Sequence, residues 1–190
     1  MEGPKMQVGF YFDQTRCIGC SACQIACKDW NDVPAGPEKW MQIKYNERGK
    51  GPDIYVSYLI NPCYHCIDPV CITVCPVGAI TKRDEDGIVI VDSDKCLGNE
   101  ECDMKCQKAC PYDAPQFGSE TGTKMHKCNF CIDRWSDNKK PACVDSCRTR
   151  AIDAGYLDEL IKKYGDRKET DNFIYSERTK PAVVFKPKLK

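Results

Sequence analysis

Residues 17–27 read Cys17-Ile18-Gly19-Cys20-Ser21-Ala22-Cys23-Gln24-Ile25-Ala26-Cys27, which is the spacing Cys-x2-Cys-x2-Cys-x3-Cys. Three thiolates this close together wrap a loop around three corners of a 4Fe-4S cube, and the fourth points to a second cluster. A single zinc ion is usually held by two cysteine pairs from distant segments. The spacing therefore predicts iron-sulfur ligation, in preference to zinc knuckles or disulfides.

The same cysteine unit recurs along the chain and forms an internal repeat. In every group the last two cysteines are four residues apart, whereas the earlier gaps vary and depart most in the third group. Loops absorb such insertions at low cost. Sixteen thiolates fit four clusters with none left over. The groups are Cys17, Cys20, Cys23, Cys27; Cys63, Cys66, Cys71, Cys75; Cys96, Cys102, Cys106, Cys110; and Cys128, Cys131, Cys143, Cys147.

The composition supports a chain that is ordered by its cysteines. Of the 190 residues, 28 are basic and 28 acidic, so no positive surplus favours nucleic acid or a membrane surface. Leu, Ile, Val and Phe make up about 19% of the chain, a level at which a highly charged sequence is suspected of disorder. Something other than aliphatic packing must therefore order the chain, and cysteine, at about 8%, is the candidate.

No targeting or membrane segment is visible in the sequence. Residues 1–6 contain no apolar run, twin arginine or cleavage site, so we expect a cytoplasmic protein that is exported only together with a partner. No stretch approaches 18 consecutive apolar residues, so we expect no direct membrane span.

The expected secondary structure is modest, because short apolar runs alternate with Gly, Pro and charge. Strands are expected at residues 54–60 and 88–91, with weaker ones at 8–12, 182–185 and, inside a surface loop at 34–53, at 41–45. Short helices are expected after prolines, at 70–74 and 142–146, and a longer one at 156–164. Residues 181–190 form an expected basic tail.

Four motifs in this order resemble the four-cluster iron-sulfur subunit of the dimethyl sulfoxide reductase family of molybdopterin or tungstopterin oxidoreductases. They are Cys63-Tyr64-His65-Cys66, Val74-Cys75-Pro76-Val77-Gly78-Ala79-Ile80, Ala109-Cys110-Pro111-Tyr112-Asp113-Ala114-Pro115-Gln116 and Lys127-Cys128-Asn129-Phe130-Cys131-Ile132-Asp133-Arg134. The resemblance covers about residues 8–154. Lys28 and Arg148 stand where a proline usually follows the last cysteine of a group.

The resemblance implies a small, loop-rich α+β fold with two bacterial-ferredoxin-like units around four 4Fe-4S clusters. An outer unit would comprise residues 1–53 and 115–160, an inserted unit 54–114, and a C-terminal extension 161–190. The implied ligands are, for cluster 1, Cys17, Cys20, Cys23 and Cys147; for cluster 2, Cys63, Cys66, Cys71 and Cys110; for cluster 3, Cys96, Cys102, Cys106 and Cys75; and for cluster 4, Cys128, Cys131, Cys143 and Cys27.

The function implied is the transfer of single electrons between a catalytic molybdenum or tungsten-pterin subunit and an external redox carrier or membrane-anchor subunit. No nucleophile with a base, paired carboxylates or phosphate loop is evident, so no catalytic residue is expected in this chain. Related relays also serve tungsten aldehyde oxidoreductases, hydrogenases and reductive aromatic enzymes, and these partners stay open. A different class of function, a scaffold folded by zinc, is the alternative.

Charged and imidazole side chains beside the cysteines admit two interpretations. In the first, a cation next to a cluster favours the reduced form of the cluster and raises its reduction potential. In the second, these cations are ordinary surface residues with no effect on a cluster. His65 and His126 lie beside predicted ligands and are expected to pack around them or face solvent. The cations concerned are Arg16, Lys28, Lys105, Lys108, Lys127 and Arg148.

Overall fold

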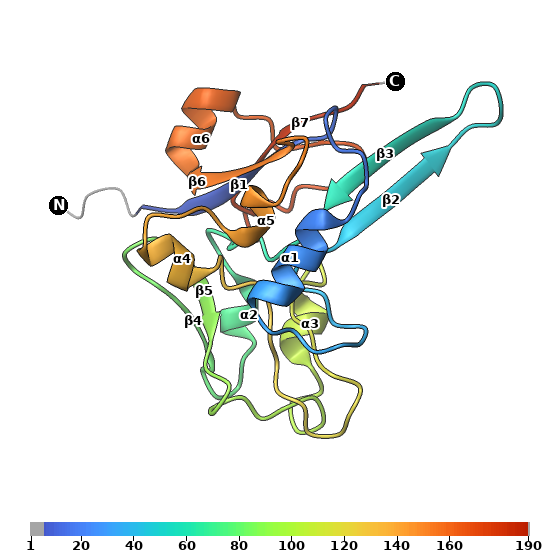
Figure 1. Ribbon diagram of the computed structural model, residues 1–190. Helices are drawn as coiled ribbons and strands as arrows, with labels where there is room; N and C mark the ends of the chain where they lie inside the picture. Colours follow the sequence, from blue (N-terminus) through green and yellow to red (C-terminus); the bar gives the residue numbers. More distant parts are fainter. Residues whose placement is uncertain (1–5, 190) are drawn as a thin grey trace.

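Both ends of the chain contribute to one three-stranded sheet. The computed structural model describes residues 6–189, so residues 1–5 of the predicted outer unit and Lys190 of the predicted tail lie outside the described part. Strand β1 (Val8–Asp13) lies between β6 (Ile152–Tyr156), which is antiparallel to it, and β7 (Val183–Lys186), which is parallel (Figure 1). All six residues of β1 are buried, as expected of a central strand covered on both faces.

Strands β2 (Ile43–Arg48) and β3 (Tyr55–Ile60) form a long hairpin that projects from the body of the molecule (Figure 1). The strand expected at 54–60 is confirmed within one residue. The expected strand at 41–45 is misplaced, because the partner strand carries the ladder from Ile43 on to Arg48. The polar residues of β2 face solvent, which is why the sequence pattern resembled a loop.

The rest of the chain is built from short elements around the cysteines. Strands β4 (Ile80–Lys82) and β5 (Val89–Val91) form a second, shorter hairpin. The helices are α1 (Ala22–Trp30), α2 (Val70–Thr73), α3 (Lys105–Ala109), α4 (Ile132–Ser136), α5 (Ala142–Asp145) and α6 (Leu157–Tyr164). The predicted helices at 70–74, 142–146 and 156–164 are confirmed within one residue at each end. Within residues 6–189, no helix is long and apolar enough to span a membrane.

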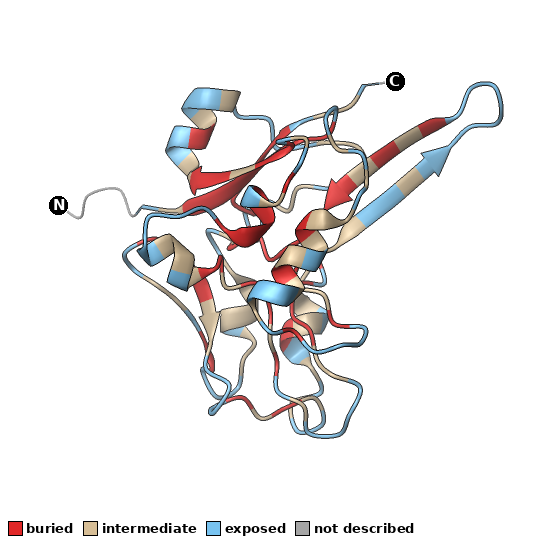
Figure 2. Cartoon of the chain, in the orientation of Figure 1, coloured by how far each residue is buried: buried red, intermediate tan, exposed pale blue. Residues whose placement is uncertain are grey.

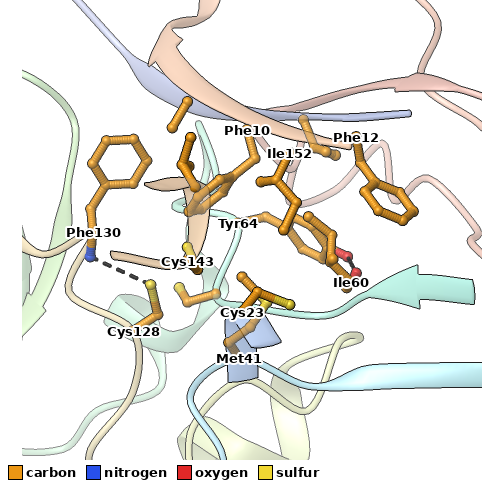
Figure 3. Close-up of a cluster of buried hydrophobic side chains, with 14 of the residues drawn as sticks. Phe10, Phe12, Cys23, Met41, Ile60, Tyr64, Cys128, Phe130, Cys143 and Ile152 are labelled. Carbon is orange, nitrogen blue, oxygen red and sulfur yellow. Dashed lines mark hydrogen bonds between the residues drawn. The ribbon is translucent and has the colours of Figure 1, made fainter. Parts of the chain in front are cut away.

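The buried residues form one large core and a smaller one. Figure 2 shows that β1 is buried along its length. In the large core, Phe10 and Phe12 of β1 and Ile152 of β6 lie over the buried Cys23, Cys128 and Cys143 (Figure 3). The smaller core joins Ile80 and Val89 of the short hairpin to Cys96 and Cys106 and their surroundings. Cysteine thus occupies core positions that aliphatic side chains fill in most domains.

The C-terminal segment completes the fold. The strand expected at 182–185 is confirmed as β7, with Val183, Val184 and Phe185 buried, so the expected tail is not a free tail over this stretch. Helix α6 lies against the same sheet, where Leu160 packs with Tyr11 and Val184. Phe173, Thr179 and strand β7, all beyond the last cysteine group, are therefore part of the packed structure.

Candidate metal centres

The first candidate centre, set 1, brings together Cys17, Cys20, Cys23 and Cys147. Cys17 and Cys20 come from the loop that leads into α1, Cys23 lies in the first turn of α1, and Cys147 follows α5, which packs against α1. Burial raises the pKa of the Cys23 thiol to about 12, and the neighbouring charges of Cys17 and Cys147 add to the rise. The sulfur of Cys147 accepts a hydrogen bond from the Ala151 amide at 3.2 Å.

Set 4 comprises Cys27, Cys128, Cys131 and Cys143. Burial raises the pKa of Cys27 to about 12, and Cys131 is the charge that contributes most after burial. Cys128 and Cys143 are buried against each other, and their pKa values lie well above the ordinary range (Figure 3). The Phe130 amide donates a hydrogen bond to the sulfur of Cys128 at 3.4 Å.

Set 2 comprises Cys63, Cys66, Cys71 and Cys110, which line one enclosed pocket. Burial raises the pKa of Cys71 to about 12, with Cys63 and Cys110 among the neighbouring charges that raise it further. Burial likewise raises the pKa of Cys66, and Cys63, Cys110 and Cys71 act in the same direction. The four thiols, drawn from two separate stretches of chain, therefore face a common space.

Set 3 comprises Cys75, Cys96, Cys102 and Cys106, which line a second pocket. Burial raises the pKa of Cys106 to about 11, and Cys102 and Cys96 are neighbouring charges. Amide groups donate to two of the sulfurs, from Ala79 to Cys75 at 3.3 Å and from Met125 to Cys96 at 3.4 Å. The enlarged gaps of the third cysteine group therefore still allow its thiols to converge.

The four sets form a row in the order 1, 4, 2, 3. Cys23 of set 1 is among the charges that raise the pKa of Cys143 in set 4. Cys63 of set 2 likewise acts on Cys128 of set 4. Cys106 of set 3 acts on Cys71 of set 2. Each set thus adjoins the next, and the row runs from an exposed thiol, Cys20, into the protein and on to set 3.

The donor groups match a multi-iron cluster. Each set offers four thiols, one for each iron of a 4Fe-4S cube, and amide hydrogen bonds to sulfur are a means by which proteins stabilise the reduced state. Among residues 6–189, no three His, Cys, Asp or Glu side chains are grouped so that they could hold a single metal ion. No disulfide is formed among the sixteen cysteines, all of which lie in the described part.

Both histidines lie outside the thiol sets. His65 is fully buried and its Nδ1 accepts a hydrogen bond from the Val89 amide at 3.0 Å. Burial, with help from nearby Lys127 and Lys82, lowers its pKa well below the ordinary value, so the ring is neutral. His126 stands edge-on to the Trp40 ring, with 6.0 Å between ring centroids.

Thr179 is a residue beside a centre that sequence reasoning missed. Thr179 lies in the C-terminal segment, is fully buried and lines the pocket of set 2. Its hydroxyl makes no hydrogen bond of good geometry. The hydroxyl nevertheless lies close to Cys66, where it lowers the pKa of the thiol and so opposes the effect of burial. No motif surrounds Thr179, so only the spatial path of the chain could reveal it.

Comparisons with known proteins identify relatives that carry 4Fe-4S clusters. A family model described as a 4Fe-4S dicluster domain matches residues 54–157, and another with the same description matches residues 16–79. The B subunit of the anaerobic dimethyl sulfoxide reductase of Escherichia coli K12 is 44% identical over 190 residues, which cover 95% of this chain and 89% of that protein. The thiosulfate reductase electron transfer subunit of Salmonella typhi is 42% identical over 160 residues, or 83% of this chain and 80% of that protein. The formate dehydrogenase iron-sulfur subunit of Haemophilus influenzae is 31% identical over 183 residues, which cover 88% of this chain and 57% of that protein.

Proposed function

Since this chain belongs to the family of 4Fe-4S dicluster electron-transfer subunits that includes the B subunit of anaerobic dimethyl sulfoxide reductase, we propose that it relays single electrons through four 4Fe-4S clusters. Sets 1, 2, 3 and 4 are the proposed ligand sets of the four clusters. A bound cube takes up and releases one electron at a time, and the chain supplies the thiolates, the dry surroundings and the amide donors.

The row of thiol sets is the observation that carries this proposal. An electron crosses a protein in short steps, so a relay needs its centres side by side. Neighbouring sets here are close enough for thiolate charges in one to act on thiols in the next. The row ends in set 1 and set 3, which makes these the entry and exit points of the proposed relay.

We assign the set 1 end to the catalytic partner, a molybdenum or tungsten-pterin oxidoreductase subunit. Around the exposed Cys20, the side chains of Ile18 and Ile25 are 59% and 63% exposed, and Tyr45, which donates to the Gly19 carbonyl, is 61% exposed. Permanent subunit interfaces are more apolar than ordinary surface, so this patch suits a stable partner.

The set 3 end suits a transient partner, an external redox carrier or a membrane-anchor subunit. Exposed charges of both signs, among them Glu101, Asp103, Lys105 and Lys108, surround Cys102 and Cys106. Charged rims steer association and allow fast exchange, which an electron carrier requires.

Paired cysteine substitutions test the ligand sets. Cys20→Ser and Cys147→Ser lie far apart in sequence but belong to one set, so both should alter the same cluster signal in EPR spectra of the reduced protein. Cys27→Ser lies four residues from Cys23 and should alter a different signal. If Cys27→Ser and Cys20→Ser changed one signal and Cys147→Ser another, the assignment of the outer sets would be wrong.

Anaerobic co-purification tests the partner. An affinity tag on this chain should bring down a pterin-containing subunit, and dithionite-reduced clusters should be reoxidised when the oxidised substrate of that subunit is added. Four clusters without any such partner would contradict the assignment of the catalytic subunit.

A further inference from the structure

One buried cation has no anion to pair with inside the described part of the protein. The Lys127 side chain is almost wholly buried, with 2% of the residue exposed. Its ammonium group donates to two main-chain oxygens, those of Val89 and of Cys128, the latter at 3.0 Å. None of the ion pairs within residues 6–189 includes Lys127.

The position of Lys127 places this charge at the centre of the row. The side chain lines the pocket formed by the set 2 cysteines, and its positive charge acts on Cys71 of that set. The next residue along the chain, Cys128, belongs to set 4, and its sulfur lies near Cys63 of set 2. Lys127 is therefore beside set 2 and adjacent in the chain to set 4.

A buried ammonium group needs a counter-charge. Removing a charge from water is costly unless the charge is paired, and two carbonyl dipoles provide only part of the stabilisation that water provided. A 4Fe-4S cube with four thiolates carries a net charge of about −2 when oxidised and about −3 after it accepts one electron. A cation held in this pocket attracts such an anionic cluster, and attracts the reduced cluster more strongly than the oxidised one.

The other five cations that adjoin cysteines in the sequence are in a different position. Water and salt screen exposed charges, so their effect on a cluster is small, whereas a buried charge acts through a medium of low dielectric constant. Lys28 is half-buried, and the remaining four cations are exposed: Arg16, Lys105, Lys108 and Arg148. The structure thus separates Lys127 from the residues that looked equivalent in the sequence.

We propose that Lys127 supplies the fixed positive counter-charge of the cluster held by set 2 and thereby raises the reduction potential of that cluster. This inference rests on the four-cluster relay proposed above. The step that it favours is the transfer of one electron from a neighbouring cluster in the row, which is oxidised as the set 2 cluster is reduced. No bond forms or breaks, and no proton moves.

The test is a potentiometric EPR titration of the anaerobically purified holoprotein. Lys127→Gln keeps a hydrogen-bond donor and removes the charge, and Lys127→Met removes both. The set 2 signal is the one that changes in Cys66→Ser. Each Lys127 variant should shift the reduction potential of this signal to a more negative value, and should shift the potentials of the other three signals less. The shift should persist at high salt, because ions do not reach a buried charge.

Lys124→Gln is the matched control, because Lys124 also donates to a main-chain oxygen of a cysteine, that of Cys96 at 2.7 Å, but is exposed. It should leave the set 2 signal in place. Iron content separates this inference from the relay itself, since about sixteen iron per chain in the wild type establishes the clusters independently. The inference is overturned if the variants keep their iron and the set 2 potential does not move, or moves only as far as in Lys124→Gln. Loss of the cluster from both Lys127 variants would also overturn it, because the role would then be structural.

Discussion

At the scale of single residues, the turn at Gly19 decides whether the loop of set 1 can form. Gly19 has a φ of +69°, and a Cβ there would lie 2.4 Å from the ring of Tyr58 on β3. The positive φ favours glycine because other residues are strained in this backbone conformation, and the nearby ring favours glycine because it leaves no space for a side chain. The packing of this loop against the hairpin thus depends on a missing side chain.

Gly19→Ala should destabilise the holoprotein by about 3 kcal/mol, because left-handed backbone costs about 1 kcal/mol and overpacking about 2 kcal/mol more. Gly78→Ala is the control, since Gly78 has a φ of +62° with nothing within 4 Å of its Cβ position, and should cost only the first contribution. The measurement is the urea concentration at which the visible cluster absorbance is lost under anaerobic conditions. Equal midpoints for the two variants would show that contact with Tyr58 is unimportant.

The cysteine spacing predicts the ligands, which remains a prediction, but it does not predict their surroundings. The spacing of cysteines fixes which thiols share a loop, whereas Lys127 and Lys124 differ in burial, which depends on how distant segments pack. Thr179 lies more than a hundred residues from Cys66 and carries no motif, so no local pattern could place it at set 2.

At the scale of elements, the strands with clear apolar patterns and the short helices after prolines were predictable, whereas α1, α3 and α4 were not. The strand at 55–60 has β-branched and aromatic residues, whereas β2 is polar and exists because its partner provides a ladder. Helices α3 and α4 have five residues each and begin after residues with left-handed backbone, Met104 and Cys131. Such short turns follow the path of the thiol loops rather than helical periodicity.

Strand β7 makes the C-terminal extension part of the core. Phe185 is 1% exposed and its ring lies 4.7 Å from that of Phe173, centroid to centroid. Phe185→Ala should therefore cost about 3–5 kcal/mol and lower the urea midpoint of cluster loss. Ile174→Ala, at a side chain 87% exposed, should change stability by less than about 0.5 kcal/mol. A midpoint unchanged in Phe185→Ala would mean that β7 is dispensable for the sheet.

At the scale of the whole molecule, we propose that four thiol sets form a row built from a repeat whose groups exchange their last cysteines. Because each group sends its fourth cysteine to another set, distant segments become tied to one another through the proposed clusters. The small aliphatic content of the sequence is then understandable, since the clusters would supply cohesion that a larger apolar core supplies elsewhere. The sequence predicted this repeat, but the order of the sets in the row needed the three-dimensional path.

The central claim, four 4Fe-4S clusters in one protein, is tested most directly by the iron, acid-labile sulfide and zinc content of the anaerobically purified protein. Four cubes require about sixteen iron and about sixteen sulfide per chain, with no stoichiometric zinc. Iron near twelve would place a vacant or altered centre at the irregular set 3, Cys75, Cys96, Cys102 and Cys106. Zinc without sulfide would contradict the relay and leave a zinc-folded scaffold as the explanation of the sixteen cysteines.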